Sequence, residues 1–409
     1  MELRHRLRDL DVFQRVEGFN ALRMVTSRKS FLYFGLVMMP VLILPPGILQ
    51  YSLLAIGIYF VNSFYWARYG PVVPRPVLIR LHRRINDYEI ATFPIKFRFL
   101  QHHAHAVMSC LGVGPQDVIC DNGSRAHCEE AFLILLFRMA RPRTLVEASA
   151  EFGIENTQVC RIFNTTMQMV VMRNHLLVFD NIPYFVPRFP MYNQALRAKI
   201  LSLGQTLPAA ALDTALLSDG KSVEVLRLGG PHIRQARIYN GHHRVHCLQF
   251  QTSAGLDGMV VDLFGPIAGA RHDEAVNRMS EFNTRLAAAQ IHQVNQYSDY
   301  KDKGYVARSH GHVAYRGRNL PQQLIDANAI MSPQRVGVEW IFNKIDQLSC
   351  FILAPRVHNI QVSAVGSVYI LGAILTNCHT CLTGSAQSVY WNVQPPKLGH
   401  YFGRPDIVV

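Results

Sequence analysis

Leu216-Leu217-Ser218-Asp219-Gly220 combines a short apolar run with an acidic residue and a glycine. The run begins at Ala215 and is typical of a buried strand, and Val223 to Leu226 continues the apolar pattern beyond the glycine. We therefore expect a buried strand that delivers Asp219 at its end, where it can serve as a ligand. Two more carboxylates stand in distinctive surroundings downstream, Asp302 in Asp302-Lys303-Gly304-Tyr305 and Glu339 in Arg335-Val336-Gly337-Val338-Glu339-Trp340.

Three carboxylates in this order are typical of a metal-dependent phosphoryl-transfer site. A phosphodiester is negatively charged, so its hydrolysis needs a group that shields the phosphate and activates the nucleophile, and two divalent cations do both. Mg²⁺ prefers oxygen ligands and retains several waters, so two or three carboxylates are enough to hold the pair. We predict that Asp219, Asp302 and Glu339 bind two Mg²⁺ or Mn²⁺ ions.

The local sequence also indicates what carries the other two carboxylates. Asp302 is expected in a loop that follows the polar stretch 293–300. Glu339 is expected on a helix, because Ser332 is a good N-cap and Pro333 suits the first helical position. Apolar residues then recur at helical spacing at positions 338, 341, 345 and 348. Glu339 borders this apolar face, where a ligand on a core-packed helix can reach a strand.

From Asp219 to about Phe402 the sequence resembles the catalytic domain of PIF/Harbinger-type DDE transposases and of the nucleases derived from them. The resemblance covers roughly half of the chain and is specific because its blocks occur in order, whereas any one block alone would be weak. It implies an α/β fold with an RNase H-like domain, in which a mixed sheet is flanked by helices and Asp219, Asp302 and Glu339 match the family's triad. The blocks are Asp219-Gly220, Tyr239 to His246, Gly265 to Asp273, Asp302 to Tyr305, Arg335 to Trp340, Asn377-Cys378-His379 and Pro395-Pro396.

The dipeptide His272-Asp273 has two explanations. It either supports the metal ligands from a second shell, as the family's His-Asp suggests, or caps a helix that starts near Glu274. Asp299 lies three residues before Asp302 and is a competing choice for the triad. The Gly-Tyr pair after Asp302 favours Asp302.

The histidines and cysteines give no metal framework of their own. Mg²⁺ does not favour imidazole, and the resemblance assigns His242, His243 and His246 to a strand. The eight cysteines show no regular spacing, which favours a reducing, intracellular compartment. Cys378-His379-Thr380-Cys381 has the spacing of a zinc half-site, but no second cysteine pair accompanies it.

The charge of the chain agrees with a nucleic-acid partner. Its formal net charge is +13, and an excess of this sign favours binding to phosphate backbones. Arg316 and Arg318 lie between Asp302 and Glu339, where they either guide DNA into the site or belong to a solvated loop. We therefore expect DNA as the partner, and the resemblance implies that it is bound both at transposon ends and at the target.

Residues 81–180 are predicted to be helical and residues 181–208, with four prolines, to be a linker. Within 144–163, Gly153 separates two helices with apolar faces, and Asn156 is the expected cap of the second. This is the outline of a helix-turn-helix, or of a plain helical hairpin. The resemblance implies a helical region of this kind before the first aspartate. The exposed residues proposed for the DNA groove are Glu155, Gln158 and Arg161.

The segment 31–67 contains no charged residue and no histidine. Its part 48–67 is mostly apolar over about 20 residues, enough to cross a bilayer. A membrane anchor, a buried helical hairpin and translated sequence from a wrongly joined gene model all remain open. A cleavable signal peptide is not indicated, because a long basic stretch comes first.

Together these patterns predict four parts: an N-terminal segment 1–80, a helical DNA-binding region 81–180, a linker 181–208 and an RNase H-like endonuclease domain 209–402. The predicted function is a nuclear DDE endonuclease or transposase. It would cut DNA at element ends and join the freed 3′-hydroxyl to target DNA, with Asp219 bridging both metals. The alternatives are a domesticated, catalytically inactive DNA-binding protein and a membrane-anchored descendant. The resemblance also suggests a Myb-like partner protein, and we expect a homo-oligomer.

Overall fold

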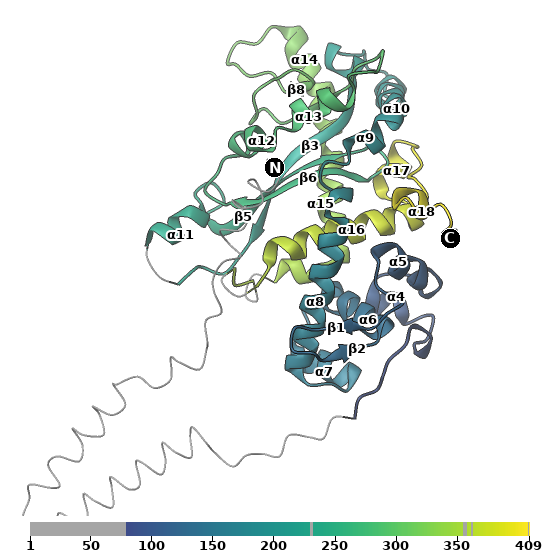
Figure 1. The fold of residues 1–409 in the computed structure, drawn as a ribbon. Coiled ribbons are helices and arrows are strands. Elements are labelled where there is room, and N and C mark those ends of the chain that lie inside the picture. The colour runs from purple at the N-terminus through teal and green to yellow at the C-terminus, as the bar shows by residue number, and fades with distance from the viewer. Residues whose placement is uncertain (1–78, 230–231, 355–357, 361–362, 408) are drawn as a thin grey trace, which may run out of the picture. The chain divides into compact units, whose positions relative to one another are not determined.

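The computed structural model describes residues 79–229, 232–354, 358–360, 363–407 and 409 (Figure 1). All of them belong to one compact unit, Ile79–Val409. The predicted anchor at 48–67 lies outside the described residues. Within them, one helix, α16 (Val365–Thr383), is long and apolar enough to cross a membrane by length and composition alone, and it is largely buried in the unit.

A sheet of six strands forms the centre of the unit and runs in the order β4-β5-β3-β7-β8, with β6 also paired to β5. β5 is antiparallel to β3, β4 and β6, whereas β7 pairs in parallel with both β3 and β8. This mixed sheet, flanked by helices, is consistent with the RNase H-like fold that the sequence predicted. The strands are β3 (Thr214–Glu224), β4 (Tyr239–Asn240), β5 (Val245–Ala254), β6 (Val260–Ala268), β7 (Ser298–Lys301) and β8 (Gly311–Val313).

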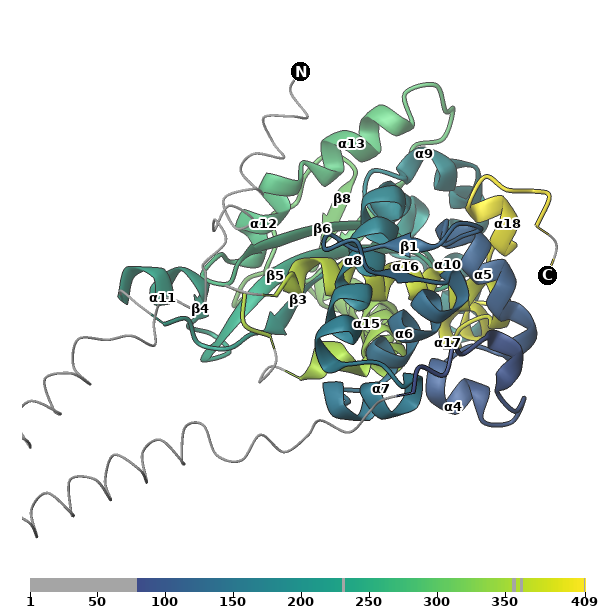
Figure 2. The same ribbon diagram turned by 60° about the horizontal axis from the view of Figure 1, so that its bottom comes forward.

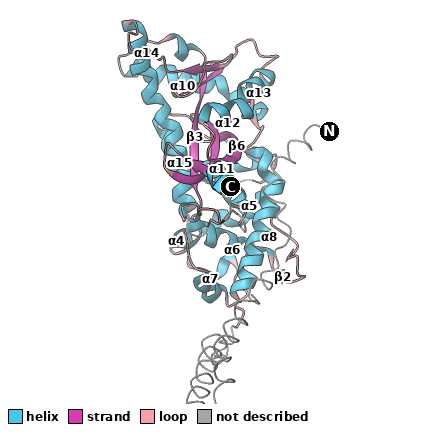
Figure 3. Ribbon diagram, turned by 90° about the vertical axis from the view of Figure 1, so that its left-hand side faces the viewer, coloured by secondary structure: helices cyan, strands magenta, loops and turns pink. Residues whose placement is uncertain are grey.

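Helices cover both faces of the sheet, with α15 on one face and α12 and α13 on the other (Figures 2 and 3). Because both faces are covered, the central strands are buried over long runs rather than at alternate positions. β3 illustrates this, since its first five residues are all buried. The helices of this part are α11 (His232–Ile238), α12 (Asp273–Ser280), α13 (Phe282–Ala289), α14 (Gln322–Met331), α15 (Val336–Leu348), α16, α17 (Ala386–Tyr390) and α18 (Leu398–Tyr401).

The region before the sheet is mainly helical, as predicted, and its buried side chains join the same hydrophobic core. A small hairpin of β1 (Val118–Ile119) and β2 (Arg125–Ala126) interrupts it. The helices are α4 (Phe93–Phe97), α5 (Ala104–Leu111), α6 (Cys128–Ala140), α7 (Leu145–Phe152) and α8 (Asn156–Asn174). Short 3-10 turns complete the unit: η2 (Ile85–Asp87), η3 (Gln101–His103), η4 (His175–Leu177), η5 (Val186–Arg188), η6 (Ala209–Leu212), η7 (Ser332–Arg335) and η8 (Cys350–Leu353).

A three-residue turn joins α7 to α8. Thr144 and Glu147 form a capping box that starts α7. Gly153 ends the helix with φ +67, and a Cβ at this position would lie 2.0 Å from the carbonyl oxygen of Ile79. α8 then begins at Asn156 with Glu155 in the N-cap position, so the predicted cap at Asn156 is wrong by one residue.

The predicted linker 181–208 is largely helical. It contains α9 (Ile182–Phe185), η5 and α10 (Phe189–Ser202), and α10 packs against β3. Pro183, Pro187 and Pro190 each occupy one of the first two positions of these elements. A helix start needs no N–H at such a position, so these prolines begin helices rather than mark an open linker.

α16 is fixed to the sheet through one side-chain amide. The Asn377 amide nitrogen donates to the Val260 carbonyl at 2.9 Å, and the Val260 N–H donates to the Asn377 Oδ1 at 2.8 Å. The same amide nitrogen lies 2.7 Å from the Tyr401 hydroxyl. Asn377 thus satisfies both backbone groups of a β6 residue inside the core.

Replacing Asn377 by Leu should therefore lower the free energy of unfolding by about 2 to 4 kcal/mol, because two buried backbone groups lose their partner. Chemical denaturation followed by circular dichroism measures this. Thr376→Val is the matched control: Thr376 is equally buried, and its hydroxyl finds no hydrogen-bond partner among the described residues. Equal stability of the two variants would show that the amide does not fix α16.

Candidate active site

Asp219 and Asp302 lie on neighbouring parallel strands. β3 continues to Glu224, so Asp219 is in the middle of a strand rather than at its end as predicted. Asp302 directly follows β7, whose last pair with β3 is Leu217 with Tyr300. Each aspartate is two residues beyond that pair, and paired strands lie about 4.8 Å apart. Continuing this register brings the backbones of Asp219 and Asp302 side by side.

Glu339 joins this site through Arg335. One nitrogen of the Arg335 guanidinium donates to the Asp219 carboxylate, and the other donates to the Glu339 carboxylate at 3.1 Å. Glu339 lies in the first turn of α15, and this helix packs against β3. A Cβ at Gly337 would come within 2.9 Å of the Leu217 side chain, so this glycine permits the close approach. The structure therefore brings Asp219 and Glu339 to one guanidinium.

The start of this helix differs from the prediction. Ser332 and Pro333 form part of η7, which follows α14 directly and leads into α15 at Val336. Ser332 has helical backbone angles, φ −63 and ψ −38, so it does not act as the predicted N-cap. The proline interrupts the helical hydrogen bonds between α14 and α15 instead of starting an isolated helix.

Asp273 is a fourth carboxylate beside Asp219. It is the first residue of α12, and a Cβ at Gly220 would lie 2.7 Å from its Oδ1. The Tyr305 hydroxyl would lie 3.4 Å from that Cβ position at Gly220. This hydroxyl has no hydrogen-bond partner among the described residues. His272 occupies the N-cap position of α12 without a side-chain hydrogen bond to it, so the capping explanation for His272-Asp273 is wrong. A supporting role for this pair stays a prediction.

The electrostatics show a surplus of negative charge at the site. Burial raises the pKa of Asp219 to about 6. The Arg335 guanidinium and the Gly220 N–H lower this pKa, whereas the negative charges of Asp273 and Asp302 raise it further. Burial also raises the pKa of Asp273, whereas the charges of the neighbouring histidines lower it. These histidines are His243, His272 and His242. Because buried like charges disfavour ionisation, a bound cation would stabilise the ionised form of these groups.

The donor set suits a hard divalent ion, since it consists of carboxylate oxygens. Within the described residues, however, no group of three or more histidine, cysteine, aspartate or glutamate side chains stands ready to hold a metal ion. Arg335 lies between two of the carboxylates, and the Asp302 carboxylate accepts the Gly304 N–H at 3.3 Å. The carboxylates of Asp219, Asp302 and Glu339 therefore each have an oxygen that accepts a hydrogen bond from another group of the protein.

A polar cavity of about 410 Å³ adjoins the candidate site, and Gly220 and Asp273 form part of its lining. The turn between β4 and β5 contributes His243 to its lining. His242 and His243 lie in this turn, so their assignment to a strand is wrong, whereas His246 is in β5 as expected. The cavity is lined by Gly220, Lys221, Ser222, Glu224, His243, Val245, Gln249 and Asp273.

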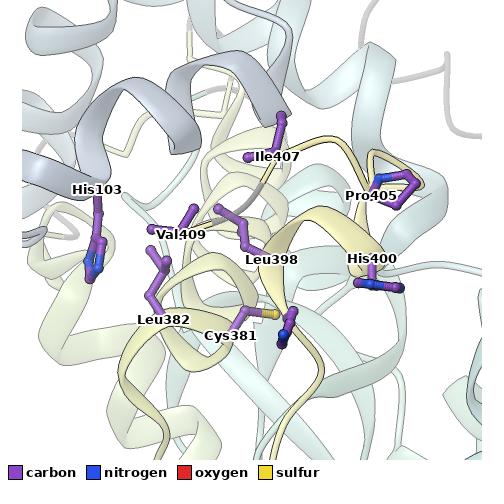
Figure 4. Close-up of a pocket in the computed structure, with 9 residues that line it drawn as sticks. His103, Cys381, Leu382, Leu398, His400, Pro405, Ile407 and Val409 are labelled. Carbon is purple, nitrogen blue, oxygen red and sulfur yellow. The ribbon is translucent and has the colours of Figure 1, made fainter.

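A second cavity, of about 110 Å³, lies elsewhere in the unit (Figure 4). Its lining includes no acidic residue and no residue of the candidate active site. It is lined by His103, Cys381, Leu382, Lys397, Leu398, His400, Pro405, Ile407 and Val409. We do not assign it to the candidate site.

The residues proposed for DNA contact occupy two places. On α8, Arg161 is exposed and Gln158 is partly exposed. Arg316 and Arg318 are exposed in the chain between β8 and α14. The Arg316 guanidinium donates to the Tyr305 carbonyl at 2.8 Å, which ties this arginine to the loop after Asp302.

Residues 219–377 match the family described as DDE superfamily endonuclease. The match begins at Asp219 and includes Asp302 and Glu339. Comparisons with curated proteins and with solved structures gave no match. The family match and the RNase H-like sheet support a transposase-like nuclease domain in this part of the chain.

The contacts of Arg335 were not predicted from the sequence, where this arginine stood out only as part of a motif. The signal was present in the spacing, because an arginine four residues before a helical glutamate faces it across one turn. The contact of Arg335 with Asp219 had no such signal, since it depends on how α15 packs against β3.

Asp299, the competing choice for the triad, is fully buried inside the sheet. Its carboxylate accepts from Ser218 at 2.6 Å and from Asn283 at 2.9 Å, and the Lys301 ammonium lies 2.6 Å away. Lys301 also donates to Asn283 at 3.0 Å. This network joins β3, β7 and α13 directly below the positions of Asp219 and Asp302, so we infer that it fixes their register.

Replacing Lys301 by Met should lower the free energy of unfolding by about 3 kcal/mol or more, because the Asp299 charge stays buried without its counter-ion. Lys303→Met is the matched control, since Lys303 is exposed two residues later and surface changes cost about 0.5 kcal/mol or less. Denaturant titration compares the two. If both variants keep the stability of the natural protein, the buried pair does not hold β7 in place.

Proposed function

We propose that this protein is a metal-dependent DNA endonuclease and transposase of the PIF/Harbinger kind. The observation that supports the proposal is that Asp219 and Glu339 share the Arg335 guanidinium, while Asp302 follows the strand that is parallel to that of Asp219. Asp219 comes from the central strand, Asp302 follows the neighbouring parallel strand, and Glu339 is joined to Asp219 through Arg335. The family match over residues 219–377 agrees with this assignment.

Two Mg²⁺ or Mn²⁺ ions are the proposed cofactors. Asp219 and Asp302 would hold them, and Glu339 would complete the set of ligands. When bound, such ions shield the phosphate and activate the attacking oxygen. Asp273 is held beside Gly220 and supports the site from α12, with His272 preceding it.

The chain's own residues hold the acidic site together. Lys221 pairs with Asp346 at 2.7 Å and thereby joins β3 to α15. The Gly220 N–H donates to the Asp219 Oδ1 at 2.9 Å and orients that carboxylate. The Lys221–Asp346 pair fixes β3 relative to the helix that carries Glu339, and the Gly220 N–H fixes the Asp219 carboxylate on its own strand. Together they favour a geometry set before substrate binds.

DNA is the proposed substrate, at transposon ends and at a target site. Arg316 and Arg318 follow the Asp302 loop and suit a path of the phosphate backbone towards the carboxylates. On α8, Gln158 and Arg161 are the residues proposed to contact a DNA groove, with Glu155 at the start of the helix. A homo-oligomer, a Myb-like partner protein and a nuclear location belong to this proposal by resemblance alone.

The second candidate is a catalytically inactive DNA-binding descendant. The observation that favours it is that Arg335 and the Asp302 loop engage the carboxylate oxygens that metals would need. Cleavage assays separate the two candidates. A membrane-anchored descendant rests on residues 48–67, which lie outside the described residues.

Asp302→Asn should abolish Mg²⁺-dependent cleavage of DNA while leaving DNA binding nearly unchanged, because the amide keeps the size but loses the charge that holds a cation. Gel assays of cleavage and fluorescence anisotropy for binding measure both properties. Asp121→Asn, at an exposed turn between β1 and β2, is the matched control and should cleave normally. Addition of EDTA should stop cleavage by the natural protein and by this control.

If the natural protein binds DNA but does not nick it with Mg²⁺ or Mn²⁺, even with a candidate partner protein present, the inactive descendant is the better description. If Asp302→Asn cleaves as well as the control, Asp302 is not part of the active site.

Arg161→Ala should weaken binding to element-end DNA, because a side-chain contact in the DNA groove is lost. Helical content by circular dichroism should stay unchanged. Arg125→Ala, exposed in β2, is the control on the same helical region. An affinity of Arg161→Ala equal to that of the control across the salt series would leave α7 and α8 as a structural hairpin.

A further inference from the structure

Arg335 occupies the position between two carboxylates of the proposed active site. It is the last residue of η7, and its guanidinium contacts Asp219 and Glu339 at the same time. The Arg335 side chain is 21% exposed, so it lies in the site and does not extend into solvent. The Oδ2 atom of Asp219 and the Oε1 atom of Glu339 both accept its N–H groups.

The charges explain why an arginine is needed there. Asp219 has a side chain only 19% exposed, and Asp273 and Asp302 add further negative charge nearby. Buried like charges are costly unless a cation compensates them. An arginine stays positively charged at all relevant pH values, so it supplies that cation permanently.

We propose that Arg335 is an internal cation that closes the acidic site in the metal-free protein and that must leave Asp219 and Glu339 before these carboxylates take up a divalent ion. This inference rests on the proposed function. Uptake is then an exchange of partners. Two N–H···O hydrogen bonds break, the freed carboxylate oxygens bind the ion, and the guanidinium turns to solvent or to an anionic substrate.

The surroundings of Arg335 allow its side chain to move while the backbone stays in place. The Gln387 amide donates to the Gly337 carbonyl, and Gly337 lies close to the Leu217 side chain. Further along α15, Asp346 pairs with Lys221 of β3. These contacts hold α15 on both sides of Glu339, so the exchange needs only a rotation of the long arginine side chain.

A fixed clamp is the opposing explanation, and it predicts the opposite sign. If Arg335 served only to position Glu339 and Asp219 as ligands, removing it would disorder them and weaken metal binding. If Arg335 competes with the metal, removing it strengthens metal binding. The direction of the change in metal affinity therefore decides between the two explanations.

The test uses the full-length chain without DNA and measures Mn²⁺ binding by electron paramagnetic resonance of the free ion. Arg335→Gln should bind Mn²⁺ about tenfold more tightly than the natural protein, since charge-assisted hydrogen bonds no longer have to break. Arg335→Lys, which keeps the charge, should fall between the two. Arg404→Gln is the matched control, because Arg404 pairs with Asp406 at 3.1 Å outside the active site.

Thermal unfolding gives a second measurement. In EDTA, Arg335→Gln should unfold at a lower temperature than the natural protein, because its carboxylates lack a counter-ion. Added Mg²⁺ should raise its unfolding temperature by more than it raises that of the natural protein. Both effects should be absent in Arg404→Gln.

Arg335→Gln that binds Mn²⁺ no more tightly than the natural protein would overturn the exchange, and weaker binding would identify Arg335 as a clamp. In either case the metal site itself would stand. If neither the natural protein nor any variant binds Mn²⁺, the proposed metal site and the exchange both fail.

If Arg335→Gln does not fold, nuclear magnetic resonance of the natural protein labelled at arginine provides the test. The Nε–Hε signal of Arg335, assigned by its loss in Arg335→Lys, should shift when Mg²⁺ saturates the protein. An unshifted signal in the Mg²⁺-bound protein would contradict the exchange.

Discussion

Several carboxylates can be gathered around one buried strand only if a cation compensates their charge. Asp219 lies in the middle of β3, and burial raises its pKa to about 6 even though Arg335 contacts it. Asp273 approaches it beside Gly220, and Asp302 approaches it from the end of β7. The structure meets this constraint with an arginine side chain that reaches two of the carboxylates. A divalent ion would compensate the same carboxylates with two positive charges, where the arginine supplies one.

The rest of the fold keeps these groups in position. The Asp299–Lys301 pair lies inside the sheet and joins β7 to β3 and α13. α15 comes close to β3 because Gly337 has no side chain at the point of contact. Asn377 fixes α16 to β6. These contacts are internal and do not involve the triad, so the scaffold can be separated from the site by mutation.

The sequence predicted the parts of this arrangement that are local. The apolar run before Asp219 and the helical spacing around Glu339 follow from the period of each element, and both elements are present. The order of the motifs predicted the RNase H-like sheet. Contacts between distant residues had no local signal. Asp273 beside Gly220 and Arg335 beside Asp219 depend on how helices pack against β3, which periodicity does not encode.

Other predictions failed for identifiable reasons. The prolines of 181–208 indicated a linker because proline breaks helices in their interior, but here each one sits where a helix or 3-10 turn begins. Ser332-Pro333 had the pattern of a helix start, but α14 already precedes it. In both cases the prolines do lie near the start of a helix or 3-10 turn, but the elements on either side of them were predicted wrongly. The sequence did favour Asp302 over Asp299, and the burial of Asp299 agrees with that choice.

The most direct test of the central claim is anomalous X-ray scattering from crystals of the protein soaked in Mn²⁺. We predict Mn²⁺ peaks bounded by the carboxylates of Asp219, Asp302 and Glu339, with the Arg335 guanidinium moved away from them. Well-ordered crystals in which Mn²⁺ binds only elsewhere, while Arg335 keeps both contacts, would contradict a metal-dependent active site at these residues.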